Sequence, residues 1–447
     1  MKTLRYIAVM VLGVCSLTGR AQDYSRLSER DIMGTSRYVG MSGAMTAVGG
    51  DPSAVADNPA GLGVYPRSEA MLTMDFQSDH AWTDDARSTR RLFMVPQASF
   101  VFSYGNPYED EGVIANNFMI SYQRLKTFHR TIETGQQPGE TSLGSVIAST
   151  GVDLKMDYPQ YRTNISNEIS LKESGYVNQY ALDWGMNISH KFYLGAGMRL
   201  YSYRLSSDAD YYERFDAYNE QGKQFDLENE NSVLMHGVGF GGSFGVIYRP
   251  CGWVRLGASF QTPTVNTLNT HTQGTLSAQT DSLRYSDAPN MSWRVTERDE
   301  DSYTAPWHAS FGAALQVGDY GMLSLQYDLT HARYMDNIHT LKAGLEFVPV
   351  VGLYINAGYA YSSTFKKGDP APVLIDPTLE RQDAHSLFPR RTQYVSAGIG
   401  YRGRFVVAQM AYQYRWQRLQ LYAHQAASPY DINTDTHRIV FTIGWHN

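Results

Sequence analysis

Apolar and polar residues alternate along much of this chain. In the segment 180–188, every second residue is large and apolar: Tyr180, Leu182, Trp184, Met186 and Ile188. The positions between them hold alanine, aspartate, glycine and asparagine. Segments 321–329 and 406–416 repeat the pattern. A period of two residues is the signature of a strand with one apolar face, so the chain is predicted to be all-β.

Further strands of this kind are predicted from residue 70 to residue 446. They lie at 70–78, 96–105, 114–124, 191–204, 232–249, 253–262, 303–317, 338–348, 352–362, 392–403 and 437–446, with a weaker one at 265–277. Bacterial single-chain outer-membrane barrels usually have an even number of strands. We therefore expect fourteen strands, with 265–277 as a doubtful fifteenth.

Two architectures bury the apolar face of such strands. A β-sandwich turns it toward a core, and a membrane barrel turns it toward lipid. Many of the predicted strands reach the length that a tilted bilayer crossing needs, and several carry Tyr or Trp near their ends. Charged residues fall on the opposite face: Arg199, Arg255, Asp328, Lys342, Glu346 and Arg402. Strand length and aromatic placement favour a transmembrane antiparallel β-barrel, in which paired charges facing the lumen are a better explanation of Arg199 and Arg255 than ligand capture.

Composition agrees with a barrel. The chain has 32 Tyr and 39 Gly among 447 residues, and only 18% of its residues are charged, below the usual figure of about 25%. Alternation keeps the average hydropathy of barrel strands low, which accounts for a mean hydropathy of −0.37. A soluble carbohydrate-binding β protein would share the tyrosine excess. The formal charge of −6 argues against a nucleic-acid partner.

The connections between strands differ in length. The stretches 125–174, 205–231, 278–302 and 363–391 are long and polar, and 142–149 within the first could form a short helix. The turns at 318–320 and 349–351 are short. Long extracellular loops and short periplasmic turns are typical of outer-membrane barrels.

The first 21 residues predict export. Lys2 and Arg5 precede an apolar run, and a small-x-small cleavage pattern ends at Ala21, which together read as a signal peptide over 1–21. Lipoprotein processing at Cys15 is the minor alternative, because bulky Val14 precedes it. Removing the signal leaves Cys251 as the remaining cysteine, so no internal disulfide is expected.

A glycine-, alanine- and serine-rich segment, 34–65, lies ahead of the strands and ends in Asn58-Pro59-Ala60-Gly61-Leu62. Small residues allow close backbone packing, and Gly adopts conformations closed to other residues. The segment therefore suits the inside of a barrel, although an ordinary glycine-rich loop has the same composition. The run Met41–Leu62 resembles the N-terminal hatch of the FadL/TodX family of outer-membrane transporters for hydrophobic compounds. The stretch Ala258–Thr264, followed by Gly274, is similar to that family's aromatic strand ending in a Ser/Thr-Pro turn.

This resemblance implies a fourteen-stranded barrel over 69–447 that is blocked by a hatch over 22–68. It implies passive diffusion of a hydrophobic ligand, without nucleotide or TonB-linked energy, and makes Asn58, Pro59 and Ala60 the gating residues. The family can release ligand sideways through a kinked strand. The third predicted strand, Ile114 to Arg124, contains Asn116-Asn117, but its sequence does not reveal a kink. The ending Trp445-His446-Asn447 departs from the aromatic terminal residue usual in such barrels.

Signatures of catalysis and of metal binding are weak. Neither Gly-x-Ser-x-Gly nor HExxH occurs, so no catalytic residue, metal site or cofactor is predicted. His190, His236 and His308 stay open as partners of a hydrolase at the barrel wall, with structural roles preferred. The run Glu297–Asp301 is expected to be solvated charge in an extracellular loop rather than a calcium site. No pair of Tyr or His residues has a spacing that singles it out for haem.

These features of the sequence together predict a function. We expect a non-enzymatic barrel in the bacterial outer membrane that takes up long-chain fatty acids or similar hydrophobic molecules by hatch-gated diffusion, in contact with outer-membrane lipid. Two alternatives remain: a barrel subunit or carrier of a secretion or surface-assembly system, with a protein partner, and a general porin. The small-residue plug argues against an open porin.

Overall fold

The structure is a computed structural model that describes residues 26–105, 111–134, 163–216, 224–280, 291–331, 337–363, 386–422 and 429–447. The predicted signal peptide, Cys15 and the possible helix at 142–149 lie outside the described residues.

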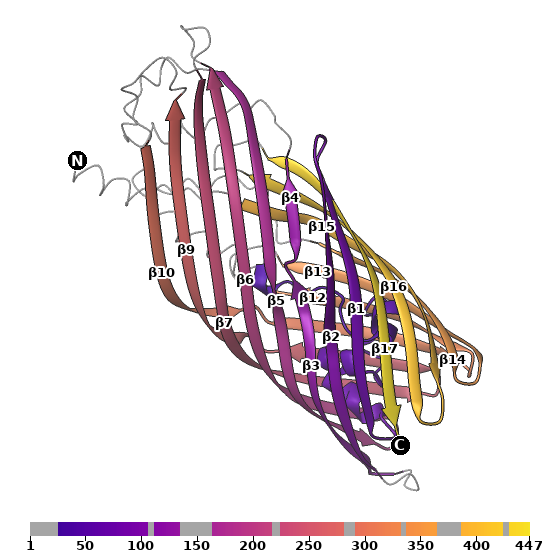
Figure 1. Ribbon diagram of the computed structural model, residues 1–447. Helices are drawn as coiled ribbons and strands as arrows, with labels where there is room; N and C mark the ends of the chain where they lie inside the picture. The colour runs from indigo at the N-terminus through magenta and orange to yellow at the C-terminus, as the bar shows by residue number, and fades with distance from the viewer. Residues whose placement is uncertain are drawn as a thin grey trace.

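One antiparallel sheet closes on itself, because β1 pairs with both β2 and β17 (Figure 1). The strands are β1 (Glu69–Trp82), β2 (Arg87–Gly105), β3 (Val113–Thr127), β4 (Arg130–Glu133), β5 (Thr163–Ile188), β6 (Phe192–Asp216), β7 (Gln224–Cys251), β8 (Val254–Gln261), β9 (Thr264–Thr280), β10 (Met291–Ala305), β11 (His308–Val317), β12 (Gly321–Thr330), β13 (Ile338–Val350), β14 (Leu353–Ser362), β15 (Ser386–Arg402), β16 (Val406–Tyr422) and β17 (Tyr430–His446). Each continues the up-and-down path of the chain around the barrel.

Three of the barrel's strands are each interrupted once. β3 and β4 form one barrel strand, because both pair with β5. β8 and β9 form a second, because both pair with β7. β10 and β11 form a third, since β10 pairs with β9 and β11 pairs with β8. The seventeen strand segments therefore form fourteen barrel strands, as predicted. The segment 265–277 is not an extra strand but the continuation of 253–262 beyond Pro263, which cannot donate a ladder hydrogen bond. Pro306 interrupts the neighbouring strand at the same level.

The barrel turns its apolar residues outward. Exposed large side chains form a band on the outer wall, among them Phe76, Leu182, Leu200, Phe311, Leu325 and Phe441. Polar side chains such as Asp75, Arg199, Gln261 and Arg438 are buried inside. This reversal of a soluble protein's pattern is that of a bilayer-spanning barrel, and it confirms the predicted fold class. None of the described helices has the length and apolarity that a membrane-spanning helix requires.

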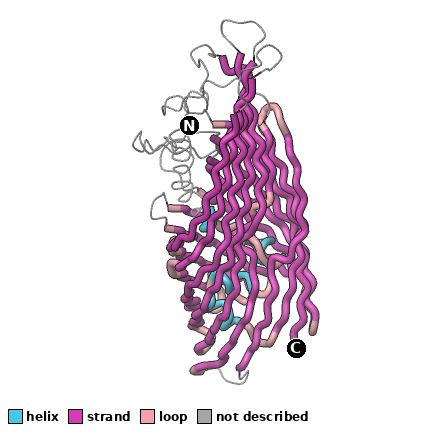
Figure 2. Tube along the Cα trace, turned by 60° about the vertical axis from the view of Figure 1, so that its left-hand side comes forward, coloured by secondary structure: helices cyan, strands magenta, loops and turns pink. Residues whose placement is uncertain are grey.

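Several strands extend well beyond the band. β5, β6 and β7 have 26, 25 and 28 residues, whereas about 9–11 residues cross a bilayer. Figure 2 shows this tall side of the wall rising beyond the rest of the barrel. The predicted long loops at 205–231 and 278–302 are therefore wrong in large part, since strand continues into them. The acidic run Glu297–Asp301 lies in β10 rather than in a loop. In the upper part of β6 the membrane pattern is reversed, because the apolar Leu205 and Tyr211 are buried and the polar Asp208 is exposed.

The described residues that precede β1 lie inside the barrel. Residues 26–68, here called the internal segment, contain the helices α3 (Ser36–Gly40) and α4 (Pro52–Asp57) and the 3-10 helix η1 (Pro59–Val64). The helices are drawn within the lower half of the wall in both views (Figures 1 and 2). Ala44, Ala47, Val55 and Leu62 are almost completely shielded from solvent. The ends of β1 and β17, with the short turns, lie at the same lower end.

Candidate functional site: the internal segment and the adjoining wall

The fold of the internal segment begins with helix capping. The Asp51 carboxylate accepts hydrogen bonds from the backbone N–H groups of Ser53 (2.9 Å) and Ala54 (3.4 Å), which caps α4. Its other oxygen accepts from the Thr35 hydroxyl at 2.7 Å, and Thr35 caps α3. Such caps satisfy the free amides of a helix end. The two short helices are thus tied to each other through their caps.

Asn58 joins three parts of the molecule. Its side-chain oxygen accepts from the Ala60 amide at 3.1 Å and caps η1. Its side-chain nitrogen donates to the Thr46 carbonyl at 2.8 Å and to the Val246 carbonyl of β7 at 3.4 Å. Asn58 is only 1% exposed, so each of these bonds replaces one that water could have made. The side chain therefore holds the internal segment together and fixes it to the wall.

Pro59 and Ala60 lie against wall glycines that have no room for a side chain. A Cβ on Gly195 of β6 would fall 2.2 Å from the Pro59 carbonyl carbon and 2.4 Å from the Ala60 nitrogen. A Cβ on Gly245 of β7 would fall 1.8 Å from the Asn58 side-chain oxygen. Ala60 packs with Tyr193 and Ile247 from the same two strands. The three sequence-predicted gating residues thus sit together on one inner surface of the wall.

These glycines belong to a belt that runs around the inside of the barrel. Gly185 is the register partner of Gly195, and Gly195 of Gly245. Others on the belt also approach backbone of the internal segment closely: Gly257 and Gly312 near residues 46–47, Gly344 and Gly358 near Met41, and Gly398 near Gly40. Because the belt removes side chains where the segment passes, the segment packs directly on the strands.

An ion pair and a hydrogen bond from a cation fix the internal segment to the wall at separate points. Arg37 of α3 makes a bidentate pair with Glu346 of β13, with N–O distances of 2.6 and 2.9 Å. Arg255 of β8 donates to the Val48 carbonyl at 3.0 Å. Burial would lower the pKa of Arg37, but the Glu346 carboxylate raises it above its usual value. The guanidinium is therefore charged when it is held.

The last carbonyls of α4 also meet the wall. Arg199 donates to the Ala56 carbonyl at 3.4 Å and pairs with Asp183 at 2.6 Å, with both charged side chains fully buried. Gln261 donates to the same carbonyl at 3.2 Å. Arg199 is thus paired with a lumen carboxylate, as predicted, whereas Arg255 binds the neutral Val48 carbonyl and Gln316.

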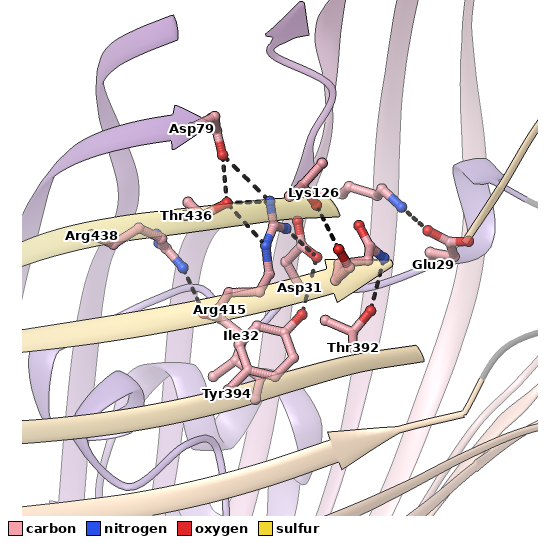
Figure 3. Close-up of polar contacts among 12 residues, drawn as sticks. Glu29, Asp31, Ile32, Asp79, Lys126, Thr392, Tyr394, Arg415, Thr436 and Arg438 are labelled. Atoms are coloured by element: carbon pink, nitrogen blue, oxygen red, sulfur yellow. Dashed lines mark hydrogen bonds and ion pairs between the residues drawn. The ribbon is translucent and has the colours of Figure 1, made fainter. Parts of the chain in front are cut away.

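Residues 29–32, near the start of the described chain, lie in the lumen above the helices (Figure 3). Asp31 pairs with Arg415 of β16 at 3.1 Å and accepts from the Tyr394 hydroxyl at 3.3 Å. Lys126 of β3 pairs with Glu29. Arg438 donates to the Ile32 carbonyl at 2.8 Å. Burial would raise the pKa of Asp31, but Arg415 and other cations hold it below its usual value, so this contact involves a carboxylate.

The wall itself is incomplete between β2 and β3. Their ladder runs from Gly105–Ala115 to Gln97–Gln123 and ends there, at Pro96, although β2 continues to Arg87 beside β1. Among the described residues above this point, side chains replace the ladder. Arg124 reaches Met94 at 3.8 Å, Arg90 donates to the Arg130 carbonyl at 3.1 Å, and Ser88 donates to the Thr131 carbonyl. We call this interval the β2–β3 gap.

The β2–β3 gap lies at the level of the apolar band. Phe93 and Val95, on the part of β2 that lacks a β3 partner, are exposed on the outer wall. On the lumen side, Leu125 and Phe128 of the facing chain belong to an apolar cluster with Leu27, Val177, Tyr201, Tyr203, Leu205, Met235 and Leu268. An apolar inner surface and the outer apolar band therefore approach each other at this gap.

The lumen near the helices is polar and narrow. A cavity of about 80 Å³ lies above α3, lined by Tyr38, Asp57, His308, Asp328 and Lys342 among others. Pockets for small molecules usually have about 300–1,000 Å³. This cavity is thus too small for a fatty acid while the internal segment is in place.

The predicted histidines do not form a catalytic group within the described residues. His190 lies in the short turn after β5, His236 points outward from β7, and His308 is in the lumen, bonded to Thr330 at 2.8 Å. Because the three histidines lie at separate places in the barrel, a structural role is favoured for each. Sequence reasoning missed Asn117 of β3, whose side chain donates to the Leu62 and Tyr65 carbonyls at 2.8 and 2.9 Å. In the sequence alone, Asn116-Asn117 is only part of a predicted strand.

A closed fourteen-stranded barrel with an outer apolar band and the internal segment inside has the fold of an outer-membrane β-barrel. The structure resembles a FadL homologue from Pseudomonas aeruginosa (TM-score 0.57, 14% identity, 94% of this chain and 99% of that one). It also resembles the Pseudomonas putida toluene transporter TodX (0.56, 14%, 94% and 99%) and the Ralstonia pickettii toluene transporter TbuX (0.52, 14%, 94% and 99%). The sequence matches no family model, and no curated protein matches it significantly. The predicted resemblance to FadL and TodX is confirmed as a likeness of fold.

Proposed function

We propose that this protein carries hydrophobic small molecules, such as long-chain fatty acids, across the bacterial outer membrane by passive diffusion. The observation that carries the proposal is the β2–β3 gap, which brings an apolar surface of the lumen to the lipid-facing band of the wall. An apolar ligand gains about 0.8 kcal/mol for each CH₂ group that leaves water. An apolar ligand is therefore stabilised along this surface, whereas a polar solute is not.

Residues 22–68 act in this proposal as a hatch, with Asn58, Pro59 and Ala60 at its fixed end. The many hydrogen bonds and ion pairs to the wall support a closed resting state, because the described cavity above α3 holds only about 80 Å³. Ligand leaves the lumen sideways through the β2–β3 gap into the bilayer, or below after the hatch shifts. The transport described for TodX and TbuX agrees with this type of cargo.

The first test is mass spectrometry of organic extracts from protein purified out of its own outer membrane. The wild type is compared with an Asn58→Ala, Pro59→Ala double variant and with a Gly252→Ala control in a turn where a Cβ meets no atom within 4 Å. An apolar molecule enriched in the wild type and control, and altered in the double variant, is expected. The same extracts without any bound apolar molecule would contradict the proposal.

Two other functions make different predictions. A secretion or surface-assembly subunit requires a stoichiometric protein partner that co-purifies from native membranes. A general porin requires a steady large conductance from the intact protein in planar bilayers. We expect neither, and we expect conductance to appear once residues 22–68 are deleted.

A further inference from the structure

A second pocket lies on the outer wall, away from the internal segment. It has a volume of about 580 Å³ and crosses β14 to β17 near the end with long connections. Tyr361, Arg390, Arg391, Arg418 and Asp431 are among its lining residues. Among its described lining residues, three arginines accompany one carboxylate, which gives that part of the pocket an excess of positive charge.

The side chains that lead up to the pocket change character in a fixed order. The outward positions of β16 are Met410, then Tyr412, Tyr414 and Trp416, and then Arg418. Apolar residues thus give way to aromatic ones and then to a cation. Tyr and Trp concentrate at the level where hydrocarbon meets headgroups. Arg418 therefore lies at the height of the lipid headgroups on the extracellular side.

The arginines are placed against each other. Arg391 of β15 and Arg418 of β16 are direct register partners, and both are exposed on the same outer face. Like charges directly opposite each other destabilise a strand pair. The carboxylate of Asp431 accepts a hydrogen bond from Gln420 at 3.0 Å, and Arg390 donates to the same Gln420 side chain. An anion held between Arg391 and Arg418 would remove this repulsion.

We propose that the pocket binds the phosphate group of an outer-leaflet lipid. Guanidinium groups bind phosphate through two parallel N–H···O bonds, and a pair on neighbouring strands offers two such forks to one group. The acyl chains of the same lipid run down the apolar band, past Tyr359, Val395 and Met410, which are all exposed there. Because the site lies outside the lumen, it does not depend on what the barrel transports.

The test is native mass spectrometry of the full-length protein in detergent with diphosphorylated lipid A, dephosphorylated lipid A and inorganic phosphate. An Arg391→Gln, Arg418→Gln double variant is compared with Arg204→Gln. Arg204 is the matched control, since it points outward four residues beyond Leu200 on β6 and faces His236 instead of another arginine. An Arg391→Lys, Arg418→Lys variant keeps the charge but not the forks.

We expect at least tenfold less bound phosphorylated lipid A in the glutamine double variant, an intermediate loss in the lysine variant and no change in Arg204→Gln. Folding of each variant is checked by its heat-modifiable migration on gels, and a glutamine variant that fails to fold leaves the lysine variant to decide. Equal retention by all variants, or equal binding of the dephosphorylated lipid, overturns the proposal. Displacement of the lipid by an equal concentration of inorganic phosphate also overturns it, in favour of a site for free phosphate.

Discussion

Gly195 and Pro59 are in backbone contact, so closely that a single methyl group on Gly195 would fall 2.2 Å from the Pro59 carbonyl carbon. One residue belongs to the barrel wall and the other to the internal segment. The contact is possible only because β6 carries glycine at that inward position. The position of the internal segment thus depends on the absence of wall side chains at the glycine belt as well as on the hydrogen bonds and ion pairs that the wall makes.

Gly195→Ala is expected to displace residues 58–61 while leaving the barrel intact. Overpacking of a tight site costs typically about 1–3 kcal/mol, and backbone on both sides leaves little room for relaxation here. The expected result is a conductance in planar bilayers that the wild type lacks. Gly252→Ala, in an open turn, is the control, and a variant as silent as the control would refute this role of the glycine belt.

Asn58→Ala removes the hydrogen bonds to Thr46, Ala60 and Val246. Leaving their buried partners unsatisfied costs about 1–3 kcal/mol. We expect faster cleavage of the internal segment in limited proteolysis, with unchanged cleavage of the barrel. Asn58→Asp keeps the acceptor for Ala60 but turns a buried carboxylate oxygen toward the Thr46 and Val246 carbonyls, so its internal segment should be cleaved at least as fast as that of Asn58→Ala. Wild-type cleavage rates in both variants would show that these bonds do not hold the segment.

Arg37→Glu should release α3 from β13, because it places a carboxylate opposite the Glu346 carboxylate where the wild type has a bidentate ion pair. Loss of a partner from a buried ion pair costs about 3–5 kcal/mol, and slight exposure of both side chains reduces this figure. The reversed pair, Arg37→Glu with Glu346→Arg, should recover part of the loss. Bilayer conductance of the single and double variants measures both effects. A double variant more conductive than either single one would contradict the pairing.

Closing the β2–β3 gap should slow release of an apolar ligand. Met94 and Arg124 approach each other across it at 3.8 Å, so cysteines at both positions can be joined by a short thiol-reactive crosslinker in a Cys251→Ser background. We expect uptake of a labelled fatty acid to fall several-fold on crosslinking and to stay unchanged when either cysteine is alone. Uptake that is insensitive to the crosslink would point to release below the hatch.

Alternation by itself determined the strands of this protein. The predicted segments, from 70–78 to 437–446, lie within strands of the structure or extend past them by one residue at an end, except that 303–317 spans β10 and β11. The lumen charges Asp328, Lys342, Glu346 and Arg402 lie in ion pairs. A bilayer on one face and a polar lumen on the other impose a period of two on any sequence that spans it. That constraint is local, so it can be read residue by residue.

The tertiary structure decided what depends on register. The glycine belt, the contact of Asn117 with the internal segment, the β2–β3 gap and the facing pair of Arg391 and Arg418 all join residues far apart in the chain. Beyond the bilayer the apolar residues of β5 and β6, such as Leu171 and Leu205, are buried inside and polar residues lie outside. The outward apolar face that marks a membrane strand ends there, so the sequence underestimates the length of these strands. Which residues become neighbours follows from the pairing of whole strands, and no short stretch of sequence contains that information.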